Sequence, residues 1–259
     1  MNIERWMLHY RTIVSELNID PEKDSMAARL LGELIKDLDS NRWYKQINET
    51  LHGSTCFVFG AGPSLPIDVA LFKKLQLHKR PVIVSADGAT SCLFEQGIRP
   101  DIIVTDLDGE MQDIQQCHKY GSYLSVHAHA DNMQLLETYV PKFKERIIGT
   151  TQVEPDYGLW NFGGFTDGDR AVLLCEELEC DSVFLLGMDL GKMVGRFSKP
   201  NLKEDVYAWP SKLIKLGIAK RILEDFAKYS KAKLYNATSK GEDINGFIRV
   251  AASELNKLV

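Results

Sequence analysis

Short runs of apolar residues alternate with helix-length segments along most of the chain. The runs occupy residues 55–59, 82–86, 102–105, 123–128, 146–150 and 182–186. Apolar runs of this length, bounded by glycine, aspartate and proline, indicate buried strands, and a helix-length return connects strands in parallel. We therefore predict an α/β fold with an open, mainly parallel sheet flanked by helices.

The segments that follow these strands indicate the remaining elements. Helical patterns cover residues 65–77, 89–96, 111–120, 133–139, 169–178 and 212–229. Residues 233–236 predict an edge strand, and residues 250–258 a short final helix. The segment 192–210 is polar and has little periodicity, which is typical of a mobile loop.

The first 50 residues carry a different pattern, because their apolar side chains recur only at helical spacing. One helix is expected to end around residues 18–21, and Asp24 and Ser25 can cap a second one. We therefore divide the chain into a helical subdomain, residues 1–50, and an α/β catalytic domain, residues 51–259. No chemistry is evident in the subdomain. Its expected role is packing, with covering of the active-site rim as the alternative.

Composition and charge restrict the class of protein. The chain has 259 residues, of which 44% are hydrophobic and 26% charged, so it can bury a sizeable core. A net charge of −5 and the lack of a basic stripe argue against a nucleic-acid partner. The five cysteines are scattered and odd in number, which favours reduced thiols in the cytoplasm. No signal-peptide-like run is present, and no stretch approaches the about 18 apolar residues of a membrane span.

Acidic residues follow two of the predicted strands that we expect to be neighbours. Asp87-Gly88 ends one strand, and Asp106-Leu107-Asp108-Gly109 ends the next. The carboxyl ends of parallel strands share one edge of the sheet, so three carboxylates would meet there and repel one another without a cation. Oxygen ligands suit Mg²⁺. A single Asp-Gly pair is more often a plain turn, but two at adjacent strand ends favour a metal site.

A glycine-rich turn follows the first strand, in the sequence Gly60-Ala61-Gly62-Pro63-Ser64. Glycines allow the backbone to approach a phosphate, and the following helix offers free N–H groups. The turn matches neither the phosphate-binding loop that ends in Gly-Lys-Ser/Thr nor the full dinucleotide fingerprint. A tight turn in which Ser64 caps the helix is an equal alternative.

A histidine-rich stretch, His127-Ala128-His129-Ala130-Asp131-Asn132, ends another strand. It differs at one position from a signature of zinc hydrolases, but the chain offers too few further histidines for a dinuclear zinc centre. Strand alternation directs His127, His129 and Asp131 to one side. Asp131 could then join the Mg²⁺ ligands while the histidines contact phosphate or substrate. The alternative is a hydrogen-bonded, half-buried histidine pair.

Two later segments offer further polar residues at the same rim. Residues 161–170 combine glycines, a hydroxyl, acids and an arginine before a helix, which suits a nucleotide- or substrate-holding loop or a simple capped turn. Asp189 ends the last buried strand between glycines. Lys192 and Arg196 are the nearest cations for a polyphosphate, although such charges are usually only solvated.

Taken in order, these segments resemble the archaeal 6-hydroxymethyl-7,8-dihydropterin pyrophosphokinase family, a relative of the thiamin pyrophosphokinase fold. The matching segments are residues 60–65, 86–89, 100–109, 127–132, 161–169 and 187–189. Thiamin pyrophosphokinases carry a similar pattern with Gly in place of Thr105 and Ser in place of Gly109. These differences make a pterin a better acceptor than thiamin.

The resemblance implies a cytoplasmic transferase that uses ATP as donor, releases AMP and serves tetrahydromethanopterin or folate-type cofactor synthesis. It implies magnesium ligands at Asp87, Asp106, Asp108 and Asp131, and the related fold commonly forms homodimers. We expect the substrates to be held by Gly60, Gly62, Ser64, Gly88, Asn161, Gly163, Gly164, Thr166, Asp167, Asp189 and Lys192.

Our hypothesis is a Mg²⁺-dependent pyrophosphokinase that moves the β,γ-diphosphate of ATP onto a hydroxymethyl group. Such transfer needs mainly positioning and neutralisation of charge. A rim carboxylate, His127 or His129 would accept the alcohol proton. The alternatives are a thiamin pyrophosphokinase-like enzyme acting on another alcohol, a zinc-dependent hydrolase and a non-catalytic nucleotide-binding module.

Overall fold

The computed structural model describes residues 1–259 and contains one large parallel sheet. Its eight strands lie in the order β10-β9-β6-β1-β2-β3-β4-β5. They are β1 (Thr55–Phe59), β2 (Val82–Ala86), β3 (Ile102–Thr105), β4 (Tyr123–Ala128), β5 (Ile147–Thr151), β6 (Ser182–Leu186), β9 (Lys233–Asn236) and β10 (Ile248–Arg249). Every pairing in this sheet is parallel, which confirms the predicted fold class.

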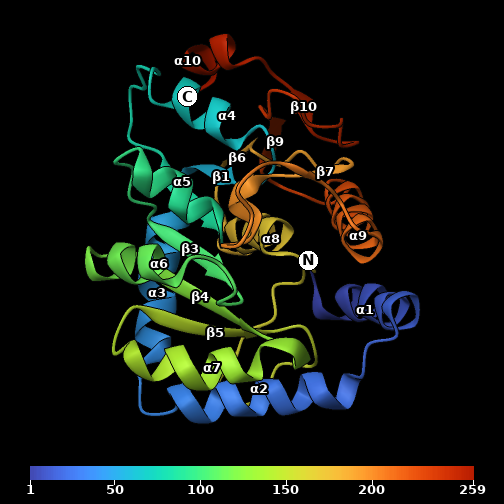
Figure 1. The fold of residues 1–259 in the computed structure, drawn as a ribbon. Helices are drawn as coiled ribbons and strands as arrows, with labels where there is room; N and C mark the ends of the chain where they lie inside the picture. Colours follow the sequence, from blue (N-terminus) through green and yellow to red (C-terminus); the bar gives the residue numbers. More distant parts are fainter.

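Helices cover both faces of this sheet (Figure 1). They are α1 (Ile3–Leu17), α2 (Pro21–Ile35), α3 (Ser40–Leu51), α4 (Leu65–Phe72), α5 (Ala89–Glu95), α6 (Met111–Lys119), α7 (Met133–Tyr139), α8 (Asp167–Glu177), α9 (Pro210–Phe226) and α10 (Leu255–Leu258). Short 3₁₀ turns lie at Ala130–Asn132, Val140–Lys142, Arg196–Ser198 and Ala252–Glu254. None of the helices is long and apolar enough to cross a membrane.

Alternation along the strands sends side chains into two separate cores. In β1, Cys56 and Val58 point into the larger core, which also contains residues of α1, α2, α3 and α8. Phe57 and Phe59 point to the opposite face and pack with residues of α4 and α5. Side chains of successive strand residues point to opposite faces, so a continuous apolar run is what a doubly covered parallel strand needs. The three N-terminal helices thus share the core of the sheet.

Several boundaries differ from the sequence expectations. The second helix begins at Pro21 with Asp20 as its N-cap, so Asp24 lies inside the helix and is buried. β9 is not an edge strand, because the two residues of β10 pair outside it. All five cysteines are free and buried, as expected.

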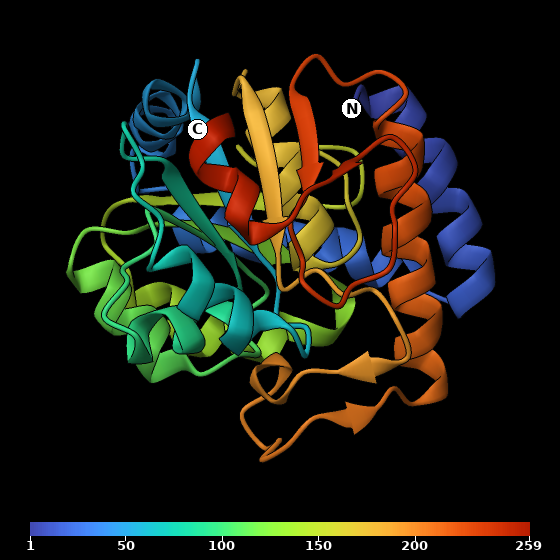
Figure 2. The ribbon, with the colours of Figure 1, turned by 90° about the horizontal axis from the view of Figure 1, so that it is seen from above.

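The segment expected to be a mobile loop contains a small antiparallel hairpin instead. It consists of β7 (Met193–Val194) and β8 (Val206–Tyr207), joined through the 3₁₀ turn Arg196–Ser198. Figure 2 shows this hairpin beside the start of α9. Each strand of the hairpin has only two residues, which is too short to leave a strand pattern in the sequence.

The strand order reverses between β1 and β6. From β1 the chain adds β2, β3, β4 and β5 on one side, whereas β6, β9 and β10 lie on the other side. In open parallel sheets, ligands bind beyond the carboxyl ends of the strands at such a switch point. The fold therefore predicts a ligand-binding site at the turns after β1 and β6 and at the neighbouring strand ends.

Candidate active site

A cavity of about 630 Å³ opens at the carboxyl ends of the strands. Its lining begins at Gly60 and Gly187, which follow β1 and β6, and continues past the ends of β2, β3 and β4 to Gln152 after β5. The turn between α1 and α2 lines the far end. The hairpin and the first turns of α9 also contribute. This volume lies within the range of small-molecule sites.

Three carboxylates meet in this cavity as the sequence predicted. Each of Asp87, Asp106 and Asp108 offers an oxygen, and these oxygens all lie within 4.8 Å of one another. The parallel pairing of β2 with β3 brings the two turns side by side. Both turns contain a non-glycine residue in the left-handed region, Asp87 at φ 38° and Leu107 at φ 68°. Such backbone is sparsely populated and is concentrated at functional sites.

Burial and the neighbouring charges shift the pKa values of the acids in this site. Burial raises the pKa of Asp87 well above its ordinary value, and the charge of Asp106 adds to the effect. Burial and Asp106 also raise the pKa of Asp167 to about 8. Burial would raise the pKa of Asp106 as well, but His129, Lys199 and Arg170 hold it below its ordinary value. Without a cation, Asp167 therefore stays largely protonated near neutral pH.

The donor set fits a hard divalent cation. One oxygen of Asp106, Oδ1, is buried and has no hydrogen-bond partner. The other two acids supply further carboxylate oxygens within the same small space. Carboxylate oxygen is the preferred ligand of Mg²⁺, and a buried oxygen without a partner costs free energy unless something binds it. Asp87, Asp106 and Asp108 are thus the residues that would hold the metal.

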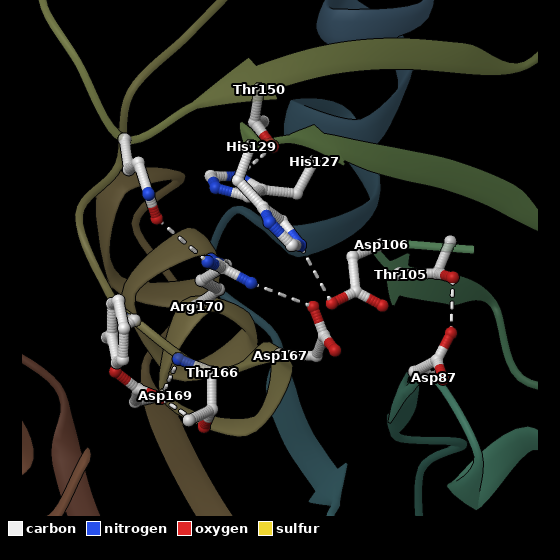
Figure 3. A network of polar contacts seen from close by, with 12 residues as sticks. Asp87, Thr105, Asp106, His127, His129, Thr150, Thr166, Asp167, Asp169 and Arg170 are labelled. Atoms are coloured by element: carbon white, nitrogen blue, oxygen red, sulfur yellow. Dashed lines mark hydrogen bonds and ion pairs between the residues drawn. The ribbon is translucent and has the colours of Figure 1, made fainter. Parts of the chain in front are cut away.

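The positions of Asp131 and Asp167 relative to the acid cluster differ from those that the sequence suggested. Asp131 lines the cavity but is exposed and lies outside the cluster of three, so the structure does not bring it to the other predicted ligands. Asp167, expected to contact nucleotide, lies beside Asp106 and pairs with Arg170 at 3.1 Å (Figure 3). The 3₁₀ turn after β4 carries Asp131 away, whereas the first turn of α8 brings Asp167 in.

The two histidines play different structural parts. His129 Nε2 donates a hydrogen bond to Asp106 Oδ2 at 3.2 Å (Figure 3). His129 Nδ1 accepts a hydrogen bond from the backbone amide of Asp131. His127 is buried and forms a hydrogen bond with Thr150. Burial lowers the pKa of His127, which keeps its ring neutral. The two histidines and Asp131 form no three-ligand group, so the zinc-hydrolase alternative lacks its metal site.

The glycine-rich turn is held from inside the protein. The amides of Gly60 and Gly62 donate to the carbonyls of Leu186 and Gly187. Ser64 donates to Asp189 through its amide at 3.1 Å and its hydroxyl at 2.6 Å. These amides are therefore not free for a phosphate, which differs from the sequence expectation. Asp189 reaches the cavity but acts as a brace for this turn.

The loop before α8 is largely a structural turn. The side-chain amide of Asn161 donates a hydrogen bond to the carbonyl of Val153 and accepts one from the amide of Gly163. Gly164 adopts φ 93° and packs closely against the backbone of Arg170. Asp169 accepts from the amides of Phe165 and Thr166 and caps the helix. Of the residues predicted to hold substrate here, Thr166 and Asp167 line the cavity, whereas Asn161, Gly163 and Gly164 do not.

Gly88, which we predicted to contact nucleotide, lines the cavity but is covered by the hairpin. A Cβ atom on Gly88 would lie 1.9 Å from the carbonyl oxygen of Phe197. The glycine therefore serves close packing between two backbones. A close backbone approach is one of the two reasons for which a turn requires glycine.

The structure also reveals cationic residues that the sequence did not single out. Lys192 is exposed and lies outside the cavity lining, whereas Lys199 reaches in and pairs with Asp108. Lys212 and Lys215 of α9 line the same cavity. No sequence signal separates Lys199 from its neighbours in a polar segment, because the path of the hairpin decides which lysine points inward.

A buried polar network ties the N-terminal helices to the site. The carboxyl group of Asp24 in α2 accepts from Tyr10 at 2.6 Å, from Gln152 at 2.6 Å and from the amide of Ala130 at 2.8 Å. Gln152 in turn accepts from Arg170 at 3.3 Å. The adjoining α1–α2 turn lines the cavity, so the N-terminal segment covers the rim and is more than a packing element.

Fold and site together define a class of protein. It is a doubly wound α/β protein with an acidic centre at the carboxyl ends of the strands that could hold a cation, an arrangement suited to the transfer of phosphate-containing groups. Comparison with known proteins narrows this class. The profile of the family described as 6-hydroxymethylpterin diphosphokinase MptE-like matches residues 32–194, and the chain belongs to this family of diphosphotransferases.

Three curated archaeal relatives, each named 6-hydroxymethyl-7,8-dihydropterin pyrophosphokinase, agree with this assignment. The protein from Pyrococcus furiosus is 40% identical over 90% of this chain and 98% of its own length. The relative from Methanocaldococcus jannaschii is 36% identical over 86% of this chain and 95% of its own. The relative from Methanothermobacter thermautotrophicus is 39% identical over 86% of this chain and 94% of its own.

One solved structure shows likeness at the level of the fold. The MAf glycosyltransferase of Magnetospirillum magneticum has a TM-score of 0.52 and 17% identity, covering 78% of this chain and 34% of that one. A thiamine pyrophosphokinase from Bacillus subtilis has a TM-score of 0.34 and 13% identity, covering 70% of this chain and 59% of that one.

Proposed function

We propose that the protein transfers diphosphate from Mg²⁺-bound ATP to the hydroxymethyl group of 6-hydroxymethyl-7,8-dihydropterin and releases AMP. The observation that carries the proposal is the buried, unpartnered oxygen of Asp106 within a three-carboxylate cluster, in a cavity of a chain that belongs to this diphosphotransferase family. The product fits a pathway that builds folate-type or tetrahydromethanopterin cofactors.

The reaction forms one bond and breaks one. The alcohol oxygen attacks the β-phosphorus, the bond from that phosphorus to the oxygen of the α-phosphate breaks, and AMP leaves with that oxygen. A bound magnesium ion would supply charge neutralisation at the phosphate oxygens. The alcohol proton passes to a rim carboxylate as the new bond forms.

The chain's own residues contribute position and charge. Asp87, Asp106 and Asp108 present the oxygens that the metal requires, and His129 orients Asp106 through a hydrogen bond of 3.2 Å. Arg170 holds Asp167 beside the cluster. The α1–α2 turn and the hairpin cover the two ends of the cavity and would exclude water from the reacting groups.

The direct test offers the purified protein ATP, Mg²⁺ and a panel of hydroxymethyl heterocycles that includes the dihydropterin and thiamin. We expect AMP and a diphosphorylated pterin in equal amounts, and neither product after chelation of Mg²⁺. AMP formation with thiamin alone would favour the thiamin alternative. Binding of ATP without AMP from any alcohol would leave a nucleotide-binding module and overturn the proposal.

A further inference from the structure

The hairpin carries a lysine to the acid cluster. Lys199 follows the 3₁₀ turn of the hairpin, and its ammonium group forms an ion pair and hydrogen bond with Asp108 Oδ2. Lys199 also lines the cavity, so its ammonium group lies beside the three carboxylates of the cluster.

The backbone around Lys199 is seated closely on two rim turns. A Cβ atom on Gly195 would lie 2.5 Å from the carbonyl oxygen of Ala61, and one on Gly88 would lie 1.9 Å from that of Phe197. The residue before the 3₁₀ turn and the middle residue of that turn are thus fixed against the turns that follow β1 and β2. This packing directs Lys199 to Asp108 and gives the contact a built geometry.

An ammonium ion at this position can pair either with the carboxylate of Asp108 or with the phosphate oxygens of a bound triphosphate. A divalent ion bound to Asp108 would place a second positive charge next to Lys199, so the lysine and the metal oppose each other at this carboxylate. A triphosphate bound to that ion would bring several negative charges to the same place. A compact ammonium with three donors suits phosphate oxygens.

Resting on the proposed function, we propose that Lys199 is a phosphate-contacting catalytic residue that exchanges Asp108 for the triphosphate when the Mg²⁺-bound nucleotide enters. The hairpin is then the element that delivers this cation. The exchange predicts opposite effects of Lys199 on two affinities: it weakens the binding of Mg²⁺ alone and strengthens the binding of Mg²⁺ with nucleotide. A lysine with a merely structural part would affect both in the same direction.

The test measures both affinities by calorimetry in the absence of the acceptor. The nucleotide is α,β-methylene ATP, in which the bond broken by the reaction is replaced. In K199M we expect Mg²⁺ alone to bind about 3- to 10-fold more tightly, because one opposing charge of a partly buried pair is gone. We expect Mg²⁺ with the nucleotide analogue to bind about 10- to 100-fold more weakly, because a charge-assisted contact is lost.

Two variants control the experiment. K199R keeps the charge and should restore both affinities in part. K203M removes an exposed charge from the segment between the two strands of the same hairpin, outside the cavity lining, and should leave both affinities at the wild-type values. Equal affinities in K199M and wild type, or a loss of both together, would overturn the assignment of Lys199. Failure of the wild-type protein to bind either Mg²⁺ or the analogue would overturn the proposed function itself, and this assignment with it.

Discussion

His129 Nε2 lies 3.2 Å from Asp106 Oδ2, and the second oxygen of that carboxylate is buried without a partner. One oxygen is thus fixed in direction by an imidazole while the other is free to bind. A hydrogen bond of this kind orients a metal-binding carboxylate and tunes its affinity. The pair links β4 to the acidic turn after β3, across two neighbouring strands of the sheet.

Removal of this imidazole should weaken metal binding. In H129A, Asp106 loses its hydrogen bond, and we expect the affinity for Mg²⁺ to fall about 10- to 100-fold. H129N can still donate a hydrogen bond and should lose less. Titration with Mg²⁺, followed by calorimetry, measures the effect. An unchanged Mg²⁺ affinity in H129A would separate His129 from the metal centre.

Asp24 should stabilise the fold by anchoring α2 at the far end of the cavity. Its carboxyl oxygens accept three hydrogen bonds from groups in α1, after β4 and after β5. In D24N an NH2 group replaces one of the two acceptor oxygens and faces a donor in place of an acceptor. We therefore expect a loss of about 2–3 kcal/mol in the free energy of unfolding. Urea denaturation measures this loss, and E22Q on the exposed side of α2 is the matched control. Equal stability of D24N and E22Q would contradict the anchoring role.

Asp167 should make the metal-free protein less stable as the pH rises. Its folded pKa is about 8, raised by burial and by Asp106, whereas an unfolded aspartate titrates near about 4. Between these values the native state holds a proton that the unfolded chain has released, so the free energy of unfolding falls as pH increases. The slope is at most about 1.4 kcal/mol per pH unit.

Thermal unfolding in chelating buffer, between about pH 5.5 and about pH 7.5, tests this sign. D167N cannot release that proton and should have a flatter dependence of stability on pH. D131N removes an exposed acid from the same rim and should retain the wild-type slope. A steeper decline in D167N than in the wild type would show that the acid cluster does not hold a proton in this way.

The strands of the sheet could be predicted because their physical signal is local. β1, β2, β3, β4 and β6 begin and end at the predicted residues, since each is a mainly apolar run that a glycine, an acid or, after β4, a histidine stops. Parallel pairing then follows from the intervening helices, and it places Asp87 and Asp106 at one edge. The acid cluster is therefore a consequence of sequence pattern and sheet geometry together.

The remaining site residues depend on contacts that sequence pattern does not encode. Asp24 becomes part of the site only because α2 packs across the ends of β4 and β5. Lys199 is one of several lysines in a polar segment, and only the packing of the hairpin on the rim turns points it inward. Asp131 was assigned from alternation along its strand and Asp167 from its place in a glycine-rich loop, whereas the turns that carry them decide which one faces Asp106.

We propose that Asp106 and its two neighbours, Asp87 and Asp108, bind the metal that supports diphosphate transfer. The most direct measurement compares AMP release from ATP and the dihydropterin in wild type, D106N and D131N, with circular dichroism as a check on folding. We predict that D106N stays folded and loses more activity than the roughly 10- to 100-fold typical of losing a residue that only orients a metal ligand, while D131N remains near wild type. Folded D106N with unchanged AMP release would contradict the account.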